Sequence, residues 1–360
     1  EGSMKTVAII QARMGSQRLA GKVMADLGGK PVLEWVIRAA NAAVGVDEVV
    51  VATSTEARDN VIEAHCAGRL DVFCVRGSED DVLSRFMLVA EATRADVFLR
   101  LTADEPFLDP TVIGEVVRRQ KLTGAAYCSN IHPRTFADGL DVECFTKKTL
   151  IESHNEATRH IDRDCVTYFA VRNRHRFPSE TVINPIPGQE TERWVLDTPE
   201  DMKFCQEIAK RWPWKKGPPS QLVILNILDK EPELRRINLH HVMNERFFAA
   251  LAEEKPPARV YTNSKKLLER ASATIPLAAQ TFSKSKIQYP ENSPLFLTHG
   301  QGGLVWDVDG NEYCDLVGAL LPNILGYRDP TVDEAIRRQL ANGISFSLAT
   351  ELEAELSETL

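Results

Sequence analysis

The sequence lacks an excess of positive charge, a long apolar run and a paired-cysteine motif. Its 43 Lys and Arg against 51 Asp and Glu give a net charge of −8, which leaves no basic field for a nucleic-acid backbone. The apolar runs, such as residues 49–52, are too short to span a bilayer. The seven cysteines include no C-x-x-C pair, which favours reduced thiols over a disulfide frame or zinc site. We therefore expect a soluble, cytoplasmic protein without nucleic-acid or membrane partners.

Short apolar runs alternate with amphipathic stretches along the first two thirds of the chain. This order predicts an α/β fold with a mostly parallel sheet flanked by helices, whose ligands lie at the carboxyl ends of the strands. The expected strands are residues 6–11, 48–53, 71–75, 97–101 and 125–129. The expected helices are residues 31–42, 55–67, 82–94 and 110–122.

The length of 360 residues predicts two folding units rather than one. Pro-rich breaks at residues 212–220 and 253–258 suggest a first domain over 4–250, a linker over 251–262 and a second domain over 263–360. In the second domain, Asp309, Gly310 and Asn311 predict a hairpin turn between two strands. A helix still continues at Leu360, so we expect the chain to end within an element. Glu1, Gly2 and Ser3 resemble a vector remnant.

A basic, glycine-containing loop follows the first expected strand. The segment ARMGSQRLAGK brings together Arg13, Gly15, Ser16, Arg18 and Lys22, and such a loop can surround a triphosphate with amides and cations. Its spacing matches neither the G-x-x-x-x-G-K-[ST] loop nor G-x-G-x-x-G. The alternative is an ordinary polar connection with solvated charges.

Two aspartates follow apolar runs that resemble strand ends. Asp104 follows VFLRLTA, and Asp197 follows the apolar Trp194, Val195 and Leu196. Facing a cationic loop, the two carboxylates would hold one Mg²⁺ against nucleotide phosphates, although each is also an ordinary turn residue in isolation. The neighbouring Asp201 has a structural explanation, because Thr198 and Asp201 form a capping-box pattern.

Two further polar clusters lie between these positions. Arg76 and Ser78 stand at another strand end, where Ser78 would also serve as a helix N-cap paired with Asp81. Asp141 and Glu143 share one face of an expected strand and either contact a substrate hydroxyl or amine or form the solvent face of an edge strand.

Six segments in this order resemble a known family. They are AIIQARMGSQRLAGKVMADLGGKPVLEWVIRAA, VVVATST, RGSEDDVLSRF, LTADEPFLDP, DGLDVECF and VLDTPEDM, spread over residues 4–210. They resemble the spore-coat polysaccharide biosynthesis cytidylyltransferases, relatives of the CMP-Kdo and CMP-acylneuraminate synthetases. The resemblance implies a nucleotidyltransferase fold and transfer of CMP from CTP to a small acceptor, with Mg²⁺ as cofactor and pyrophosphate as product.

The resemblance also implies roles for individual residues. The catalytic set is Lys22, Arg13 and Asp104, the metal is held by Asp104 and Asp197, and the acceptor contacts Asp141, Glu143 and Arg163. The nucleotide contacts are Ala12, Arg13, Gly15, Ser16, Arg18, Lys22, Arg76, Ser78 and Thr102. The chain departs from the family pattern at Ala20, Ala103, Asp164 and Cys165.

Residues after about 261 resemble the start of a class III, pyridoxal-phosphate-dependent aminotransferase similar to glutamate-1-semialdehyde aminomutase. The segment GQGGLVWDVDGNEYCDLVGALLPNILGY carries this likeness. The lysines beyond Tyr261 are Lys265, Lys266, Lys284 and Lys286, and all precede the hairpin, so none matches the family's Schiff-base lysine. We expect pyridoxal phosphate only in a longer chain.

The acceptor is expected to be a sugar acid or a related precursor of a cell-surface polysaccharide. A phosphorylated polyol or a phosphonate suits the same phosphorus chemistry. An alternative from another class is an assembly module with a degenerate nucleotide site, joined to a working aminotransferase. Both resembled families usually pair, so a homodimer is expected.

Overall fold

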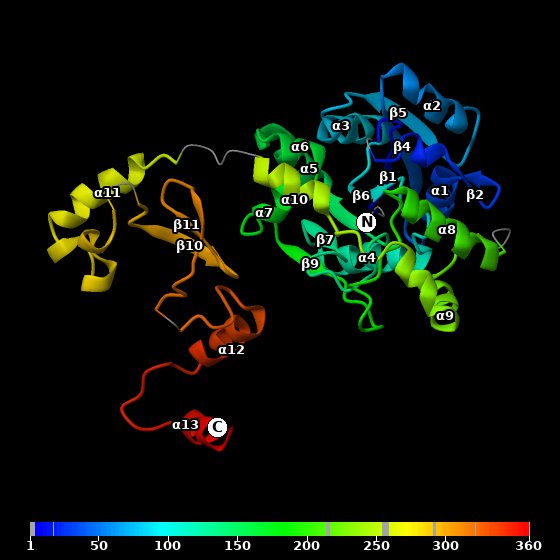
Figure 1. The fold of residues 1–360 in the computed structure, drawn as a ribbon. Coiled ribbons are helices and arrows are strands. Elements are labelled where there is room, and N and C mark those ends of the chain that lie inside the picture. The colour runs from blue at the N-terminus through cyan, green and yellow to red at the C-terminus, as the bar shows by residue number, and fades with distance from the viewer. Residues whose placement is uncertain are drawn as a thin grey trace. The chain divides into compact units, whose positions relative to one another are not determined.

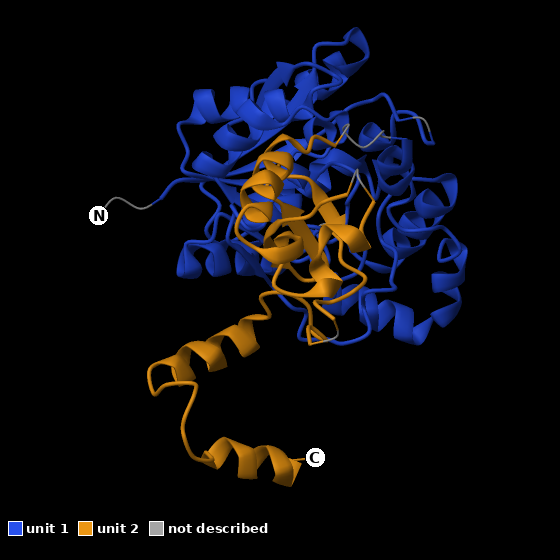
Figure 2. Cartoon of the chain, turned by 90° about the vertical axis from the view of Figure 1, so that its left-hand side faces the viewer, with its two compact units in different colours: residues 1–254 blue, residues 255–360 orange. Residues whose placement is uncertain are grey.

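The computed structural model describes residues 4–16, 18–213, 217–253, 259–290, 293–320 and 322–359. Residues 1–3 and the centre of the expected linker, 254–258, lie outside this description. The chain divides into two compact units, residues 1–254 and 255–360, which Figure 2 colours blue and orange. In the described part of the chain, no helix combines the length and apolar character needed to cross a membrane.

A seven-stranded mixed sheet forms the first unit, in the order β5-β4-β1-β6-β8-β7-β9 (Figure 1). The strands β5, β4, β1 and β6 run parallel, β8 is antiparallel to both neighbours, and β9 is parallel to β7. The bounds are β1 Thr6–Gln11, β4 Glu48–Ser54, β5 Phe73–Gly77, β6 Val97–Thr102, β7 Tyr127–Ser129, β8 Glu143–Thr146 and β9 Ser179–Thr181. The prediction of a mostly parallel α/β sheet is confirmed.

Helices cover both faces of this sheet because successive side chains of a strand point in opposite directions. In β1, Ala8 and Ile10 belong to one apolar core, whereas Val7 and Ile9 belong to the other. The first core includes α1 Val32–Ala42, α4 Pro110–Thr123, α8 Pro199–Arg211 and α9 Gln221–Lys230. The second core includes α3 Val82–Thr93, α5 Lys147–Glu156 and α7 Tyr168–Arg172.

Shorter elements complete the first unit. They are η1 Lys22–Met24, β2 Asp26–Leu27, β3 Lys30–Pro31, η2 Ala57–Asp59, α2 Asn60–Cys66, α6 His160–Asp164, η4 Pro232–Ile237 and α10 Glu245–Glu253. Leu225 and Leu228 of α9 are buried in the first core, so this segment completes the first unit.

Three local expectations are wrong. The helix expected over 55–67 begins as α2 at Asn60, because the buried Asp59 carboxylate accepts hydrogen bonds from Met14 N and Ser54 Oγ. The N-cap of α3 is Asp81 rather than Ser78, because the helix starts at Val82 and Asp81 Oδ1 accepts the Ser84 N–H. The apolar run before Asp197 is an extended segment outside the sheet.

The second unit contains a three-stranded antiparallel sheet, β10-β11-β12, with bounds Leu297–Gln301, Leu304–Asp307 and Glu312–Cys314. The predicted hairpin turn is present, and Asp307 Oδ1 accepts the N–H groups of Asp309 and Asn311 within it. The helical segments are α11 Thr262–Ser272, η5 Pro276–Ala278, η6 Phe282–Lys284, η7 Lys286–Gln288, α12 Pro330–Leu340 and α13 Glu351–Thr359.

Candidate active site

The basic loop lies at the carboxyl ends of the central parallel strands. β4 and β6 flank β1, with Ala52 paired to Gln11 and Gln11 paired to Thr102. The loop is fastened at its start, because Ala12 N donates to Ala52 O at 3.1 Å. It then folds back on itself, since Gly21 N donates to Met14 O at 3.1 Å, and this return leads into η1 with Lys22.

Lys22 lies at the centre of the site. Its Nζ is 2.5 Å from Asp104 Oδ2 and 2.6 Å from Asp197 Oδ1, and its side chain is 8% exposed. Burial alone would lower the pKa of Lys22, but attraction to Asp104 and Asp197 raises it above its ordinary value. Burial alone would also raise the pKa of Asp104, and Lys22 holds it below its ordinary value. The ammonium and the Asp104 carboxylate are therefore both charged at neutral pH.

Asp197 reaches this position through backbone contacts. Leu196 N donates to Asp104 O at 2.8 Å, which places Asp197 beside Asp104. Behind it, Asp201 Oδ2 accepts the N–H groups of Asp197 and Thr198, both at 2.9 Å, and Thr198 caps α8 in the expected capping box. The backbone of Trp194 packs closely against Gly139. A Cβ at position 139 would lie 2.6 Å from the Trp194 carbonyl carbon.

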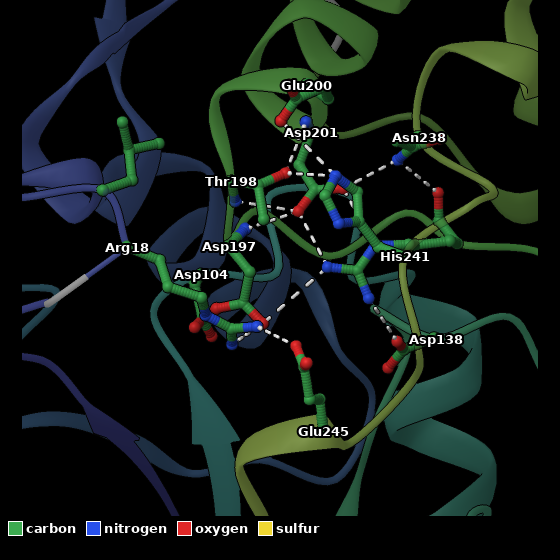
Figure 3. Close-up of polar contacts among 12 residues, drawn as sticks. Arg18, Asp104, Asp138, Asp197, Thr198, Glu200, Asp201, Asn238, His241 and Glu245 are labelled. Carbon is green, nitrogen blue, oxygen red and sulfur yellow. Dashed lines mark hydrogen bonds and ion pairs between the residues drawn. The ribbon is translucent and has the colours of Figure 1, made fainter.

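Arg18 extends this cluster toward the helix α10. Figure 3 shows Arg18 beside Asp197 and Glu245, with Asp104 next to Asp197. Arg18 Nη2 donates to Asp197 Oδ2 at 2.7 Å, and its Nη1 is 3.8 Å from Glu245 Oε2. The carboxylates of Asp104 and Asp197 are thus paired with two cations, Lys22 and Arg18.

Another carboxylate of the site, that of Glu143, comes from the first residue of β8, which pairs with Ser129 of β7. Glu143 is 2% exposed, and its carboxylate accepts hydrogen bonds from Arg100, Tyr127 and Thr167 at 2.5 to 2.6 Å. Burial acts to raise the pKa of Glu143, but the Arg100 charge and these bonds hold it below its ordinary value. The solvent-face alternative for Glu143 is wrong, because β8 lies between β6 and β7.

Three neighbouring acids share this region with fewer cations. Arg134 forms a bidentate pair with Asp141, with distances of 2.6 and 2.7 Å. Burial, followed by the charges of Asp141 and Asp104, raises the pKa of Glu105 well above its ordinary value. Burial and repulsion from Asp141 raise the pKa of Asp138 to about 7 despite the nearby Arg134. The carboxyl groups of Glu105 and Asp138 therefore shift toward the neutral form.

These groups line one cavity of about 860 Å³. Residues of α10 and the segment before it cover part of its wall, including Asn244, Glu245 and Phe247. Phe247 packs edge-on against Tyr168, with ring centroids 5.0 Å apart. A cavity of this size can hold a nucleotide with a small second substrate.

A model of the family described as cytidylyltransferase matches residues 7–212, more than half of the chain. The chain belongs to the cytidylyltransferase family. The first unit is therefore a nucleotidyltransferase. A solved cytidylyltransferase from Leptospira borgpetersenii serovar Hardjo-bovis is 26% identical and superposes with a TM-score of 0.61, covering 67% of this chain and 99% of that one. The spore coat polysaccharide biosynthesis protein SpsF of Bacillus subtilis is 40% identical over 124 residues, 33% of this chain and 51% of its own length.

A second family model, class-III aminotransferase, matches residues 287–360. Glutamate-1-semialdehyde 2,1-aminomutase of Desulfatibacillum aliphaticivorans is 40% identical over 97 residues, which is 27% of this chain. The match spans 23% of that relative's length. The chain thus joins a cytidylyltransferase unit to a segment similar to part of an aminotransferase.

The cytidylyltransferase cavity gathers most of the residues that the sequence singles out. Its wall includes Ala12, Arg13, Ser16, Arg18, Lys22, Thr102, Asp104, Asp141, Glu143 and Asp197. Four others are not part of that wall: Gly15, Arg76, Ser78 and Arg163.

The three polar members of this second set are engaged elsewhere. Arg76 donates to Ser54 O at 2.8 Å and pairs with Glu63 at 2.7 Å. Ser78 is exposed and accepts the Asp81 N–H, while Arg163 pairs with Asp81 at 2.7 Å. Their assigned roles in the cytidylyltransferase stay predictions.

Sequence reasoning did not single out Arg85, Arg134, Asp138 or α10 of the cytidylyltransferase cavity. The available signal for Arg85 was its place on the apolar stripe of α3, three residues after Val82 and four before Val89, where a charge is unexpected. Asp138 lies in the quoted segment DGLDVECF, but the two-residue spacing that singles out Asp141 and Glu143 does not include it.

Asp104 and Asp197 are the carboxylates of the site that face one common position, as the ligands of a divalent cation would. In the ranges that the structure describes, no group of three or more His, Cys, Asp or Glu side chains is arranged to hold a metal. Asp104 and Asp197 nevertheless converge on one ammonium, and Mg²⁺ is commonly held by one or two carboxylates together with substrate phosphates. The residues of the cytidylyltransferase therefore fit such an ion when phosphate oxygens complete its shell.

Proposed function

We propose that the first unit transfers CMP from CTP to an oxygen of a small acceptor and releases pyrophosphate. The observation that carries this proposal is the convergence of Lys22, Asp104 and Asp197 at the carboxyl edge of β1 and β6, inside the cavity of about 860 Å³. Cations from a loop beside two carboxylates are what a polyphosphate and its metal need.

The chain's residues would act by position and charge. An acceptor oxygen attacks the α-phosphorus in line, the bond to the bridging oxygen breaks, and pyrophosphate leaves with the electron pair. Arg13, Arg18 and Lys22 would neutralise the negative charge that grows on the departing pyrophosphate. Asp104 and Asp197 would hold Mg²⁺, which supplies charge neutralisation at the phosphates when bound.

Ion pairing at the site supports this assignment. Lys22 and Arg18 pair with the carboxylates of Asp104 and Asp197. When a polyphosphate and its cation bind, the basic side chains would pair with the phosphate oxygens and the carboxylates would pair with the cation.

For the acceptor, we propose a sugar acid or a related precursor of a cell-surface polysaccharide. The name of the B. subtilis relative, a spore coat polysaccharide biosynthesis protein, supports this class. Asp141 and Glu143 belong to the cavity wall, and each is held by an arginine partner. A phosphorylated polyol or a phosphonate is the second candidate.

A degenerate nucleotide site remains the competing hypothesis. Its supporting residues are Ala103, which is buried in the first core, and Asp164 and Cys165, which line the cavity. The charged cluster at Lys22 favours an active site over this hypothesis. That pyridoxal phosphate belongs only to a longer chain, and that two copies pair, stay predictions.

The test is pyrophosphate release by the 360-residue protein with Mg²⁺, each of the four nucleoside triphosphates and a panel of acceptors. The panel contains Kdo, nonulosonic acids, sugar phosphates, glycerol phosphate and aminoethylphosphonate. Turnover with CTP and one acceptor supports the proposal. Failure to bind CTP in calorimetry with Mg²⁺ overturns it and favours the degenerate module.

A further inference from the structure

Arg85 is a buried cation in the cavity wall without a carboxylate partner. The residue is 2% exposed, and it lines the cavity from α3. Among the described residues, no carboxylate lies within 4.0 Å of its guanidinium, and its Nε has no hydrogen-bond partner. Burial, together with the nearby charge of Arg13, lowers the pKa of Arg85 to about 10, so it stays charged at neutral pH at an energetic cost.

The position of Arg85 is built into the fold. Its Nη1 donates to Ala52 O at 3.3 Å, at the end of β4. Gly77 makes room for the stem of Arg85, because a Cβ at Gly77 would lie 2.8 Å from Arg85 Cγ. One donor is thus anchored to the backbone and Nε is buried, so the ligand-binding donors are those that remain on the two Nη atoms.

Arg85 stands on the opposite side of β1 from Asp104. Ala52, Gln11 and Thr102 form one row across β4, β1 and β6, and Asp104 follows two residues after Thr102. Because neighbouring strands lie about 4.8 Å apart, the row spans about 10 Å from Ala52 to Thr102. This separation is comparable with the reach of a nucleotide from its α-phosphorus to its base.

We propose that Arg85 reads the base of the nucleotide and selects cytosine through its O2 and N3 atoms. A guanidinium only donates hydrogen bonds, and cytosine presents these two acceptors side by side. Uracil has an N–H donor at N3, which would face a donor of Arg85. The inference rests on the proposed cytidylyl transfer and makes Arg85 a specificity-determining residue of that reaction.

Guanine is the strict competitor, because its O6 and N7 also form an adjacent acceptor pair for arginine. A phosphate group is the alternative ligand for Arg85, since the nearby Arg13 belongs to the loop assigned to the triphosphate. The test therefore compares a ligand that carries a base with a polyphosphate that carries none, which separates base binding from phosphate binding.

The experiment is equilibrium calorimetry of the 360-residue protein with CTP, UTP, GTP and inorganic tripolyphosphate, all with Mg²⁺. It compares the unchanged protein with Arg85→Met, Arg85→Lys and the control Arg118→Met, an exposed arginine of α4. Arg85→Met should fold, because it replaces a buried charge, which Asp59, Asp164 and Glu79 offset only from beyond ion-pair distance, with an apolar side chain of similar length. Arg85→Lys keeps the charge and loses the planar fork.

We expect Arg85→Met to weaken CTP binding roughly 10- to 100-fold, as loss of one bidentate base contact does, and to remove the preference for CTP over UTP. Arg85→Lys should lose the same preference, and neither change nor Arg118→Met should alter tripolyphosphate binding. Equal losses for CTP and tripolyphosphate, or unchanged CTP selectivity, overturn the inference alone. If the unchanged protein binds no nucleotide, the proposed function fails as well.

Discussion

The cavity is lined by carboxyl side chains whose pKa values are shifted in opposite directions. Asp104 lies 2.5 Å from the Lys22 ammonium, which holds the pKa of that carboxyl below its ordinary value. Glu105 is the next residue, yet burial and two neighbouring negative charges raise its pKa well above the ordinary value. The pKa values of these adjacent acids are thus shifted in opposite directions because, among the described residues, a cation lies within hydrogen-bond distance of Asp104 and not of Glu105. Charge in this site is decided by partners rather than by residue type.

The largest effect is expected at Asp104, whose charged carboxylate is needed for the proposed reaction. We expect Asp104→Asn to lower the turnover number by about 10³-fold, because it removes a charge that stabilises the transition state. Pyrophosphate release measures this loss, and unchanged far-ultraviolet circular dichroism checks the fold. Asp26→Asn, an exposed acid of β2, is the control and should keep full turnover. Unchanged release by Asp104→Asn would remove Asp104 from the mechanism.

The next prediction concerns Lys22, the cation that pairs with Asp104 and Asp197. Lys22→Met leaves Asp104 and Asp197 facing each other without the ammonium, so we expect the free energy of unfolding at pH 7 to fall by about 1 to 3 kcal/mol. Urea titration measures this change. Mg²⁺ should restore more stability to the variant than to the unchanged protein, because the cation can then neutralise both carboxylates. The exposed Lys203→Met is the control, and equal effects of Mg²⁺ on both proteins would contradict a metal site here.

A pH-dependent effect is expected at Asp138, whose pKa in the folded state is about 7. An unfolded aspartate releases its proton near pH 4, so between about pH 4 and 7 the folded state holds a proton that the unfolded state has lost. Stability from this group is therefore present at low pH and declines as pH rises, by at most about 1.4 kcal/mol per pH unit.

Asp138→Asn should remove this decline. Urea unfolding of the variant and of the unchanged protein at pH 5, 6, 7 and 8 measures the difference between their slopes. Curves that run parallel across this range would show that Asp138 titrates normally in the folded protein.

The smallest effect is expected at Glu105. Because burial favours the protonated form of this carboxyl, Glu105→Gln is a close substitute for it, and its oxygen can still accept the Asp141 N–H. We expect the free energy of unfolding at pH 7 to change by less than about 0.5 kcal/mol. Glu143→Gln is the matched comparison, and it should cost about 3 kcal/mol because it leaves Arg100 without its buried partner. Similar losses in the two variants would mean that Glu105 is ionised.

The sequence was most informative where a pattern reports a local preference. Alternation of apolar runs located β1 over the observed residues and placed β4 and β6 within a residue. Strand ends then indicated the edge where Lys22 and Asp104 meet, because parallel strands present their carboxyl ends together. The capping box at Thr198 was also readable, since both partners are three residues apart.

Other features depend on contacts between distant segments. Ser78 and Asp81 are both good cap residues, and only the packing of α3 decides that Asp81 caps it. Arg76 follows a strand as a ligand-binding residue would, yet Ser54, Glu56, Asn60 and Glu63 hold it away from the cavity wall. Sequence spacing cannot report such contacts, because the partners come from separate elements.

The sequence by itself determined the class of the fold, the loop that carries the cations and the two aspartates that face it. These follow from periodicity, turn residues and charge, which act over a few neighbouring positions. Only the tertiary structure decided which carboxyl groups have raised or lowered pKa values, and that Arg85 is buried beside the cavity with no carboxylate within 4.0 Å among the described residues. The reason is physical: burial and ion pairing depend on which segments the fold brings within a few ångströms of each other.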